Sequence, residues 1–261
     1  MEGYDAGTYG RVFADVYDTW YHDLGDLDSL TAALAALVPD GGRVCELGVG
    51  TGRVAIALAT ACADRAVTIL GVDASREMLE RLHAAAADLI AAGRIVPVEG
   101  DMVDDLPDGP LDLVVIAFNT VFNLTEHERQ AELFAAVAER LAPDGRLVIE
   151  AIAPEGDVTE AGRGVIVDDV GIRELGVDKV VLSISRHHLG EQLAEGQFVE
   201  FTESGGVRLR PWRVRYATVA QLDAMATAAG LVLERRHGEV DGTDWREGDR
   251  RHLSVWRRVA S

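Results

Sequence analysis

Short apolar runs alternate with longer amphipathic segments between residues 43 and 151. Runs of this kind are typical of strands buried on both faces, and the segments between them repeat apolar residues at helical spacing. Ser75 is a good N-cap for one such segment, and Gly93 ends it. The alternation predicts a parallel sheet with helices on both faces. The expected strands are residues 43–47, 67–72, 95–99, 111–118 and 146–151, and the expected helices are residues 51–62, 75–92 and 126–141.

The pattern changes near residue 154. From residue 165 to residue 216, strand-like stretches follow one another with turn signals and no convincing helix between them, and Ser204–Gly206 reads as a hairpin turn. A helix over residues 219–229 and two closing strands, 231–236 and 253–259, follow. We therefore predict one domain in four parts. These are an N-terminal cap of two helices (1–40), an alternating core that binds the cofactor (41–154), an antiparallel β insertion (155–217), and a C-terminal helix with closing strands (218–261).

Acidic residues outnumber basic ones by 44 to 25, which gives a formal net charge of −19. A surface this acidic repels phosphate backbones, so nucleic acids and anionic membranes are not expected as partners. No apolar run approaches the roughly 18 residues of a membrane helix, and the first 21 residues lack the basic and apolar regions of a secretory signal. Cys45 and Cys62 have neither metal-ligand nor disulfide spacing. We expect a cytoplasmic protein without a bound metal.

A glycine-rich turn follows the first expected strand of the core, in the stretch Val44-Cys-Glu-Leu-Gly-Val-Gly-Thr-Gly-Arg53. Gly48, Gly50 and Gly52 allow the backbone to pass close to a ligand and to adopt angles that other residues avoid. Ligands of open α/β sheets bind at the carboxyl ends of the strands, which is where this turn lies. Its spacing is GxGxG and differs from the GxGxxG of pyrophosphate-binding turns.

Two acidic residues end the next two expected strands. Asp73 lies 21 residues after Gly52, where a carboxylate accepts both ribose hydroxyls of a nucleoside. Ala74 and Met78 then fall where an adenine ring would rest. Asp101 can accept a hydrogen bond from the exocyclic amine of adenine while Met102 packs on the ring. The remaining acids of that segment, Asp104, Asp105 and Asp108, are interpreted as a solvated loop.

These motifs together resemble those of class I S-adenosylmethionine-dependent methyltransferases, from about residue 9 to residue 154 and again from residue 219. The resemblance implies a seven-stranded, mostly parallel Rossmann-like sheet with an antiparallel last strand, S-adenosylmethionine as cofactor, and a small-molecule methyl acceptor. It also assigns roles: the three glycines shape the site of the methionine moiety, Asp73 holds the ribose, and Glu46 orients the amino group directly or through water. Asp101 and Met102 would hold adenine, and Phe118 and Asn119 would border the cofactor. The motifs are ELGVGTG, GVDASREML, EGDM, LDLVVIAFNTVFNL and LAPDGRLVIEA.

Within that class the chain is most similar to small-molecule N-methyltransferases of the glycine and amino-sugar kinds. The similarity places Tyr9 and Tyr21 over the cofactor, with Tyr21 near the transferring methyl group. Asn123 stands where those enzymes often have histidine. Because asparagine cannot act as a base, it would only orient the substrate or the cofactor. Tyr17 and Trp20 are expected to pack a helix face on the core.

Several alternatives stay open. The chain could transfer a methyl group to N, O or C of a small molecule in secondary metabolism, or bind S-adenosylmethionine for a cyclisation or elimination without net methyl transfer. A third reading is a nucleotide-binding module of the NAD type, against which the GxGxG spacing and Met102 count. His187 and His188 point to opposite faces of one strand, so one of them could face the site. The alternating Arg208, Arg210, Arg213 and Arg215 form an exposed sheet face, or contact an acidic substrate or another subunit of a homodimer.

Overall fold

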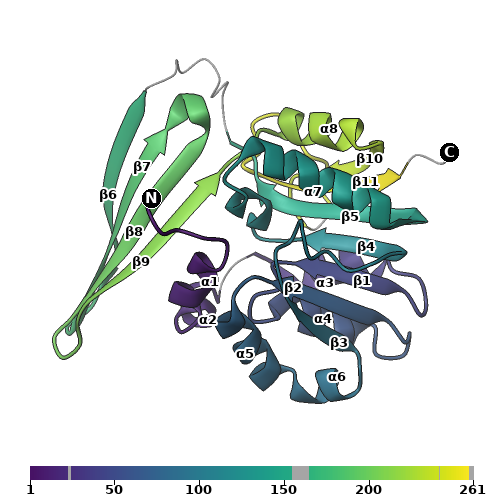
Figure 1. The fold of residues 1–261 in the computed structure, drawn as a ribbon, viewed down its shortest axis with the longest axis horizontal. Helices are drawn as coiled ribbons and strands as arrows, with labels where there is room; N and C mark the ends of the chain where they lie inside the picture. The colour runs from purple at the N-terminus through teal and green to yellow at the C-terminus, as the bar shows by residue number, and fades with distance from the viewer. Residues whose placement is uncertain (23–24, 155–164, 241, 259–261) are drawn as a thin grey trace.

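A computed structural model describes residues 1–22, 25–154, 165–240 and 242–258. These residues form a seven-stranded sheet with its helices and a separate four-stranded sheet, with a short helical N-terminal segment between them (Figure 1). The predicted start of the insertion at residue 155, and Val259 of the last expected strand, lie outside the described residues.

The larger sheet confirms the predicted seven strands. Its order is β10-β11-β5-β4-β1-β2-β3, and β11 runs antiparallel to both of its neighbours. The chain order reverses between β4 and β1, and such a switch point opens a crevice at the carboxyl ends of the strands. The strands are β1 (Arg43–Leu47), β2 (Thr68–Asp73), β3 (Ile95–Glu99), β4 (Leu111–Ile116), β5 (Leu141–Ile152), β10 (Leu231–His237) and β11 (Arg251–Arg258).

Helices cover both faces of this sheet because its central strands are apolar on both sides. In β4, Val114 and Ile116 join the core beneath α7 (His127–Arg140) and α8 (Val219–Ala228), whereas Leu113 and Val115 join the opposite core. That second core lies beneath α3 (Leu27–Ala35), α4 (Arg53–Ala61) and α5 (Arg76–Ala85). The helix predicted over residues 75–92 is interrupted at Ala86, which leaves the helical region and separates α5 from α6 (Ala87–Ala91). Among the described residues, no helix is long and apolar enough to cross a membrane.

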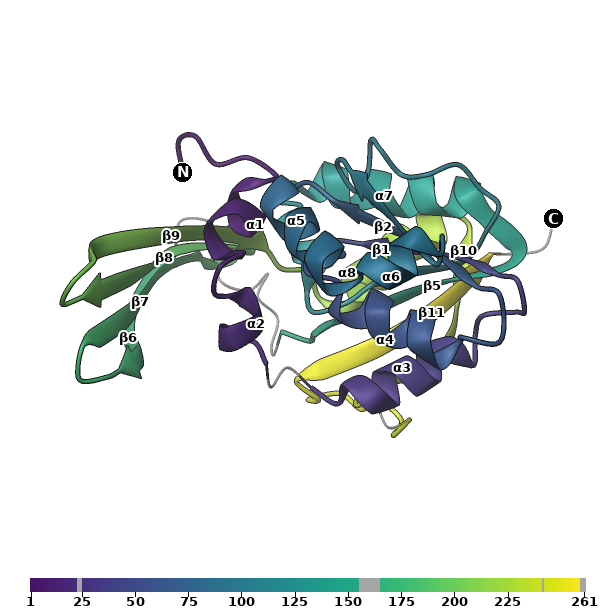
Figure 2. The ribbon, with the colours of Figure 1, turned by 90° about the horizontal axis from the view of Figure 1, so that it is seen from below.

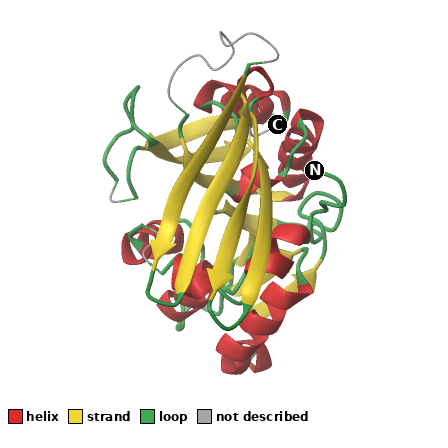
Figure 3. Cartoon of the chain, turned by 90° about the vertical axis from the view of Figure 1, so that its left-hand side faces the viewer, coloured by secondary structure: helices red, strands yellow, loops and turns green. Residues whose placement is uncertain are grey.

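The insertion is a four-stranded antiparallel sheet of its own, in the order β6-β7-β8-β9. Its register brings His187, Ala194 and Val214 directly beside one another on one face. Figure 3 views the sheet from its opposite, outer face, which no helix covers in that view. The strands are β6 (Ile166–Leu175), β7 (Lys179–His188), β8 (Leu193–Thr202) and β9 (Gly206–Arg215), and the short 3-10 helix η2 (Leu189–Glu191) follows β7.

The N-terminal segment lies between the two sheets (Figure 2). It contains α1 (Thr8–Phe13) and α2 (Tyr17–Trp20) before α3, so three helices replace the two that were predicted. Apolar contacts hold it against the insertion: the Phe198 ring lies edge-on to Phe13 at 5.8 Å and to Trp20 at 5.5 Å between ring centroids.

A buried arginine also ties the insertion to this segment. Arg210 is 1% exposed, and its guanidinium donates to Asp15 Oδ1 at 2.6 Å and to Glu200 Oε2 at 2.9 Å. Arg208, which is half exposed, shares Asp15. The prediction of an exposed arginine face is therefore wrong for Arg210, because the N-terminal segment covers it. Arg213 lies 3.7 Å from Glu195.

Candidate functional site

Two adjoining cavities lie at the switch point between β1 and β4. The first, here called the turn cavity, lies against the glycine-rich turn. It brings together most of the residues predicted to bind a cofactor, although they come from separate elements. Those are Tyr9, Gly48, Gly50, Asp73, Ala74, Met78, Asp101 and Met102, and Tyr17, Thr120 and Asn123 also line it.

Glycine is required at the three positions of the turn for different structural reasons. A Cβ on Gly50, whose φ is +56°, would point into open space, and a Cβ on Gly48 would lie 2.3 Å from Thr120 Cγ2. Both residues line the turn cavity. Gly52 does not line it: it is the N-cap of α4 with φ +90°, and a Cβ there would lie 2.2 Å from Leu82 Cδ1. Gly52 thus allows helix packing and shapes the turn only indirectly.

Asp73 holds the turn and keeps acceptor capacity for a ligand. Its Oδ2 accepts the Gly50 backbone N–H at 2.8 Å, and its Oδ1 accepts that of Ser75 at 2.8 Å. Burial raises the pKa of Asp73 and these two bonds lower it, with a net rise. Because each carboxylate oxygen has two lone pairs, both oxygens can accept a further hydroxyl from the cavity.

Glu46 lies beneath the turn and does not line the cavity. It is 5% exposed, and burial raises its pKa to about 8, although the Ala55 backbone N–H donates to it. Its Oε2 is buried without a hydrogen-bond partner among the described residues. A buried, unpaired carboxylate oxygen is costly, and a cationic group nearby would offset that cost.

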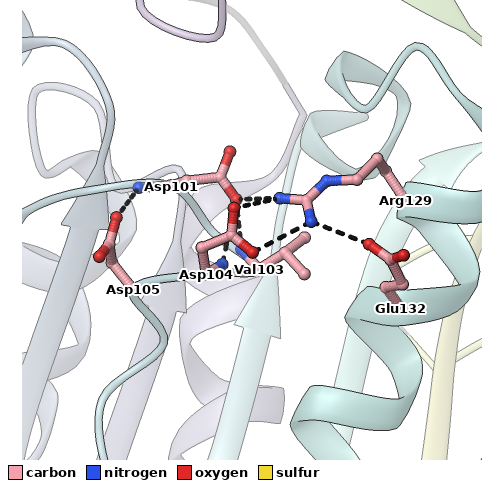
Figure 4. Close-up of polar contacts among 6 residues, drawn as sticks. All are labelled: Asp101, Val103, Asp104, Asp105, Arg129 and Glu132. Atoms are coloured by element: carbon pink, nitrogen blue, oxygen red, sulfur yellow. Dashed lines mark hydrogen bonds and ion pairs between the residues drawn. The ribbon is translucent and has the colours of Figure 1, made fainter.

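Asp101 is fixed by a network that the sequence did not indicate (Figure 4). Its Oδ1 accepts from the Val103 backbone N–H at 2.8 Å and from Arg129 Nη2 on α7, also at 2.8 Å. Arg129 binds Asp104 as well, and Asp105 accepts the Asp101 backbone N–H at 2.8 Å. Asp104 and Asp105 are exposed, as the interpretation of a solvated loop predicted, and in addition both brace the loop. Asp101 Oδ2 accepts no hydrogen bond from any described residue, so it is available to a ligand.

The second cavity, here called the aromatic cavity, has a volume of about 380 Å³ and lies beneath the inner face of the four-stranded sheet. Tyr9, Tyr17, Thr120 and Asn123 line both cavities and form their junction. Eight aromatic side chains line the aromatic cavity. They are Tyr9, Tyr17, Tyr21, Phe118, Phe122, Phe198, Trp212 and Tyr216, and Asn119, Ile152, His187, Ala194, Val214 and Arg251 complete the described wall together with Thr120 and Asn123.

The tyrosines of the N-terminal segment meet in this wall. Tyr21 lines the aromatic cavity only, where its hydroxyl accepts a hydrogen bond from Tyr9 Oη at 3.4 Å. Arg53 Nη1 donates to the Tyr21 backbone carbonyl at 3.2 Å, and the Arg173 guanidinium lies 5.1 Å from the ring centroid. Tyr17 was expected only to pack a helix on the core, but it lines both cavities. Trp20 packs as expected.

The segment after β4 adopts strained backbone angles at Phe118 (φ +51°) and Asn119 (φ +65°), just before the 3-10 helix η1 (Thr120–Asn123). Bonds to the end of β5 hold this conformation. The Phe118 backbone N–H donates to Glu150 Oε2 at 2.8 Å, and the Ile152 backbone N–H donates to Asn119 Oδ1 at 2.6 Å. Phe118 and Asn119 therefore line the aromatic cavity and not the turn cavity. Left-handed angles at non-glycine residues are typical of functional sites.

The two histidines of β7 separate as their alternation predicted. His187 lines the aromatic cavity, where its Nε2 lies 3.0 Å from Ser185 Oγ. His188 points to the outer face, with its Nε2 3.8 Å from Glu195.

Comparisons with known proteins agree with this geometry. Residues 44–145 match the family described as "Methyltransferase domain". The structure of the CcbJ methyltransferase from Streptomyces caelestis is 36% identical, covers 98% of this chain and 100% of its own, and has a TM-score of 0.83. This chain belongs to the S-adenosylmethionine-dependent methyltransferases of class I.

Two further relatives extend the comparison. The cypemycin N-terminal methyltransferase from a Streptomyces species is 28% identical over 258 residues, which are 97% of this chain and 99% of that protein. S-adenosylmethionine-bound CalS10, an amino pentose methyltransferase from Micromonospora echinaspora, is 22% identical, covers 94% of this chain and 97% of its own, and shares the fold with a TM-score of 0.64. The methyltransferase acts on a small-molecule acceptor, and its cofactor is S-adenosylmethionine.

The residues of the turn cavity fit this cofactor. The open space at Gly50 suits a close backbone approach, and Asp73 retains lone pairs for hydroxyls. Beneath the turn, outside the cavity lining, the unpaired Glu46 oxygen suits a cationic amino group. Among the described residues, no group of three or more side chains has the composition of a metal site. Sequence reasoning missed Tyr17, Arg129 and Arg251, and no local signal in the sequence marks any of the three.

Proposed function

We propose that this methyltransferase transfers the methyl group to the nitrogen of a small-molecule amine in secondary metabolism. The nitrogen lone pair attacks the sulfonium methyl carbon, the carbon–sulfur bond breaks, and its electron pair stays on sulfur as S-adenosylhomocysteine forms. The cofactor supplies an activated methyl group, so the protein needs mainly to orient the reactants and exclude water.

The junction of the two cavities carries this proposal. Its described residues are Tyr9, Tyr17, Thr120 and Asn123. Burial raises the pKa of both tyrosines above its ordinary value, so both stay protonated and neither acts as a base. An amine with a free lone pair needs no base for attack, whereas a phenol or alcohol does. The name of the cypemycin N-terminal methyltransferase agrees with a nitrogen acceptor.

We assign the predicted site residues accordingly. Asp73 binds the ribose hydroxyls, Asp101 and Met102 bind adenine, and Glu46 faces the amino group. Asn123 orients the acceptor. The test is incubation with labelled S-adenosylmethionine and matched amines and alcohols, such as benzylamine and benzyl alcohol. We expect methyl incorporation only into amines, and preferential labelling of the alcohols would refute the proposal.

Tyr21 is proposed to lie near the transferring methyl group, because its ring and hydroxyl both favour a positive centre. Replacing Tyr21 with Phe keeps the ring and removes the hydroxyl that bonds Tyr9. Turnover should fall more than the affinity for S-adenosylhomocysteine. An equal loss in both quantities would show that Tyr21 acts on cofactor binding alone.

His187 is proposed to take the proton that an ammonium acceptor must lose before it attacks. A general base gives the pH–rate profile a limb on its acidic side, where its protonation removes activity. The limb should disappear in His187→Gln and remain in the matched control His188→Gln, because only His187 lines the cavity. Asn123→Ala should lower turnover and keep the limb. Loss of the limb in Asn123→Ala, or its survival in His187→Gln, contradicts these roles.

The predicted homodimer is proposed to form through the outer face of the four-stranded sheet. Direct strand neighbours place large exposed apolar side chains together there. With a net charge of −19, two copies repel one another over much of their surface, whereas the apolar part of this face can pair with itself. One end of the same face carries the ion pair between Asp168 and Arg186. Six of these side chains are more than half exposed: Ile166, Val170, Ile172, Leu175, Val207 and Leu209.

Sedimentation should therefore show a dimer. The double variant Ile172→Asp/Leu209→Asp should be a monomer, while the control Val232→Asp on β10 should remain dimeric. A monomeric wild-type protein excludes this interface.

A further inference from the structure

Arg251 differs from the other arginines near the site in the partners that its guanidinium binds. Arg129 and Arg210 each bind two or more carboxylates at hydrogen-bond distance. The guanidinium of Arg251 has only a loose ion pair, with its Nη2 3.9 Å from Glu150 Oε1, and no hydrogen bond to any described residue. Its side chain is 34% exposed, so about two thirds of it is removed from water. The five N–H donors of this guanidinium can therefore bind an acceptor group of a ligand.

The register of the large sheet places Arg251 in the wall of the aromatic cavity, and Arg251 also lines a neighbouring pocket with Asp26, Glu150 and Glu239. Arg251 is the first residue of β11 and pairs with Ile152 of β5, and both residues line the cavity. Arg251 lines the aromatic cavity and not the turn cavity, so it is not one of the residues that form the junction. An acceptor that spans the aromatic cavity can therefore place one end at Arg251 and the other at the junction.

The charges in the cavity wall also favour an anionic ligand. The described wall contains Arg251 and His187 but no aspartate or glutamate. This absence contrasts with the whole chain, which has 44 acidic residues and 25 basic ones. Glu150 compensates Arg251 only in part, because its other oxygen, Oε2, accepts the Phe118 backbone N–H. The cavity thus attracts an anion, while its eight aromatic side chains suit an apolar or aromatic body.

We propose that the methyl acceptor carries a carboxylate on an apolar or aromatic body, and that Arg251 binds this carboxylate. The planar guanidinium can donate two parallel hydrogen bonds to a carboxylate. The body lies among the aromatic rings, including Phe198 and Trp212 of the insertion, and the nucleophile reaches the junction. This inference rests on the proposed function, because it takes the aromatic cavity to be the acceptor site.

The test uses two unreactive probes of equal size, 3-phenylpropanoate and 3-phenylpropanamide, with the S-adenosylhomocysteine-loaded protein. Calorimetry should show that the carboxylate binds at least about tenfold more tightly than the amide, since the charge-assisted pair is worth more than its neutral counterpart. Arg251→Gln should abolish this preference, and Arg251→Lys should keep part of it. The control Arg257→Gln, at an exposed position on the same strand, should leave it unchanged.

Three outcomes would overturn the inference: equal binding of the two probes, a preference that survives in Arg251→Gln, or binding of neither probe. The affinity for S-adenosylhomocysteine should be the same in Arg251→Gln as in the wild type, and an equal loss there would show general misfolding. The probes have no amino group, so their result is independent of whether amines or alcohols are methylated. A failure of this inference is thereby separated from a failure of the proposed function.

Discussion

Replacing Asp73 with Ala should weaken the binding of S-adenosylhomocysteine about 30- to 150-fold. The variant loses the charged acceptor proposed for two ribose hydroxyls. Because hydrogen bonds to charged groups are stronger than neutral ones, the free energy of binding should become less favourable by about 2–3 kcal/mol. The same carboxylate also accepts the Gly50 and Ser75 backbone N–H groups. Part of the loss therefore comes from a loosened turn. Calorimetric titration with S-adenosylhomocysteine measures the total.

Two further variants separate these contributions. Asp73→Asn keeps one acceptor oxygen and the shape of the side chain, so it should fall between the wild type and Asp73→Ala. Glu99→Ala removes a carboxylate from the residue paired with Asp73 on the neighbouring strand, and it should bind normally. An unchanged affinity in a folded Asp73→Ala variant would remove Asp73 from the cofactor site.

Replacing Arg210 with Met should destabilise the folded protein by about 3 kcal/mol. Removing one partner of a buried ion pair leaves the other charge uncompensated, which costs about 3–5 kcal/mol. We expect the lower end of this range because Asp15 is 37% exposed, so water can solvate its charge once Arg210 is removed. Glu200, which is only 14% exposed, accounts for most of the remaining cost. The variant also loses the bond from Arg210 to the Val12 backbone carbonyl. Urea unfolding measures the change.

Arg208→Met is the matched control, because Arg208 binds the same Asp15 but is 54% exposed. Exposed ion pairs contribute at most about 1 kcal/mol, so this variant should remain close to the wild type. Equal destabilisation by both substitutions would mean that burial of Arg210 is not the reason for its contribution. In Arg210→Met, turnover should fall too, because the N-terminal segment that carries Tyr9 and Tyr17 rests on the insertion.

The sequence by itself determined the core and the edge of the sheet at which the proposed cofactor site lies. Alternating apolar and amphipathic segments predicted the five strands between residues 43 and 151, because a strand buried on both faces must be apolar along its length. The two closing strands were predicted from the stretches that follow the last helix. Chain order then placed Gly50, Asp73 and Asp101 together, since successive parallel strands end at the same edge of the sheet. A local rule also predicted that His187 and His188 point to opposite faces, because successive residues of a strand alternate, but it did not decide which of the two faces the cavity.

Only the tertiary structure decided what surrounds that core. The burial of Arg210 depends on Asp15, 195 residues away, and the fixing of Asp101 depends on Arg129, 28 residues away. The alternating arginines of β9 do not reveal which face another segment will cover. Likewise, Tyr17 lines both cavities and Arg251 lines the aromatic cavity because separate segments pack against each other there. Local patterns fix periodicity and strand order, whereas contacts between distant segments depend on how the sheets and helices dock.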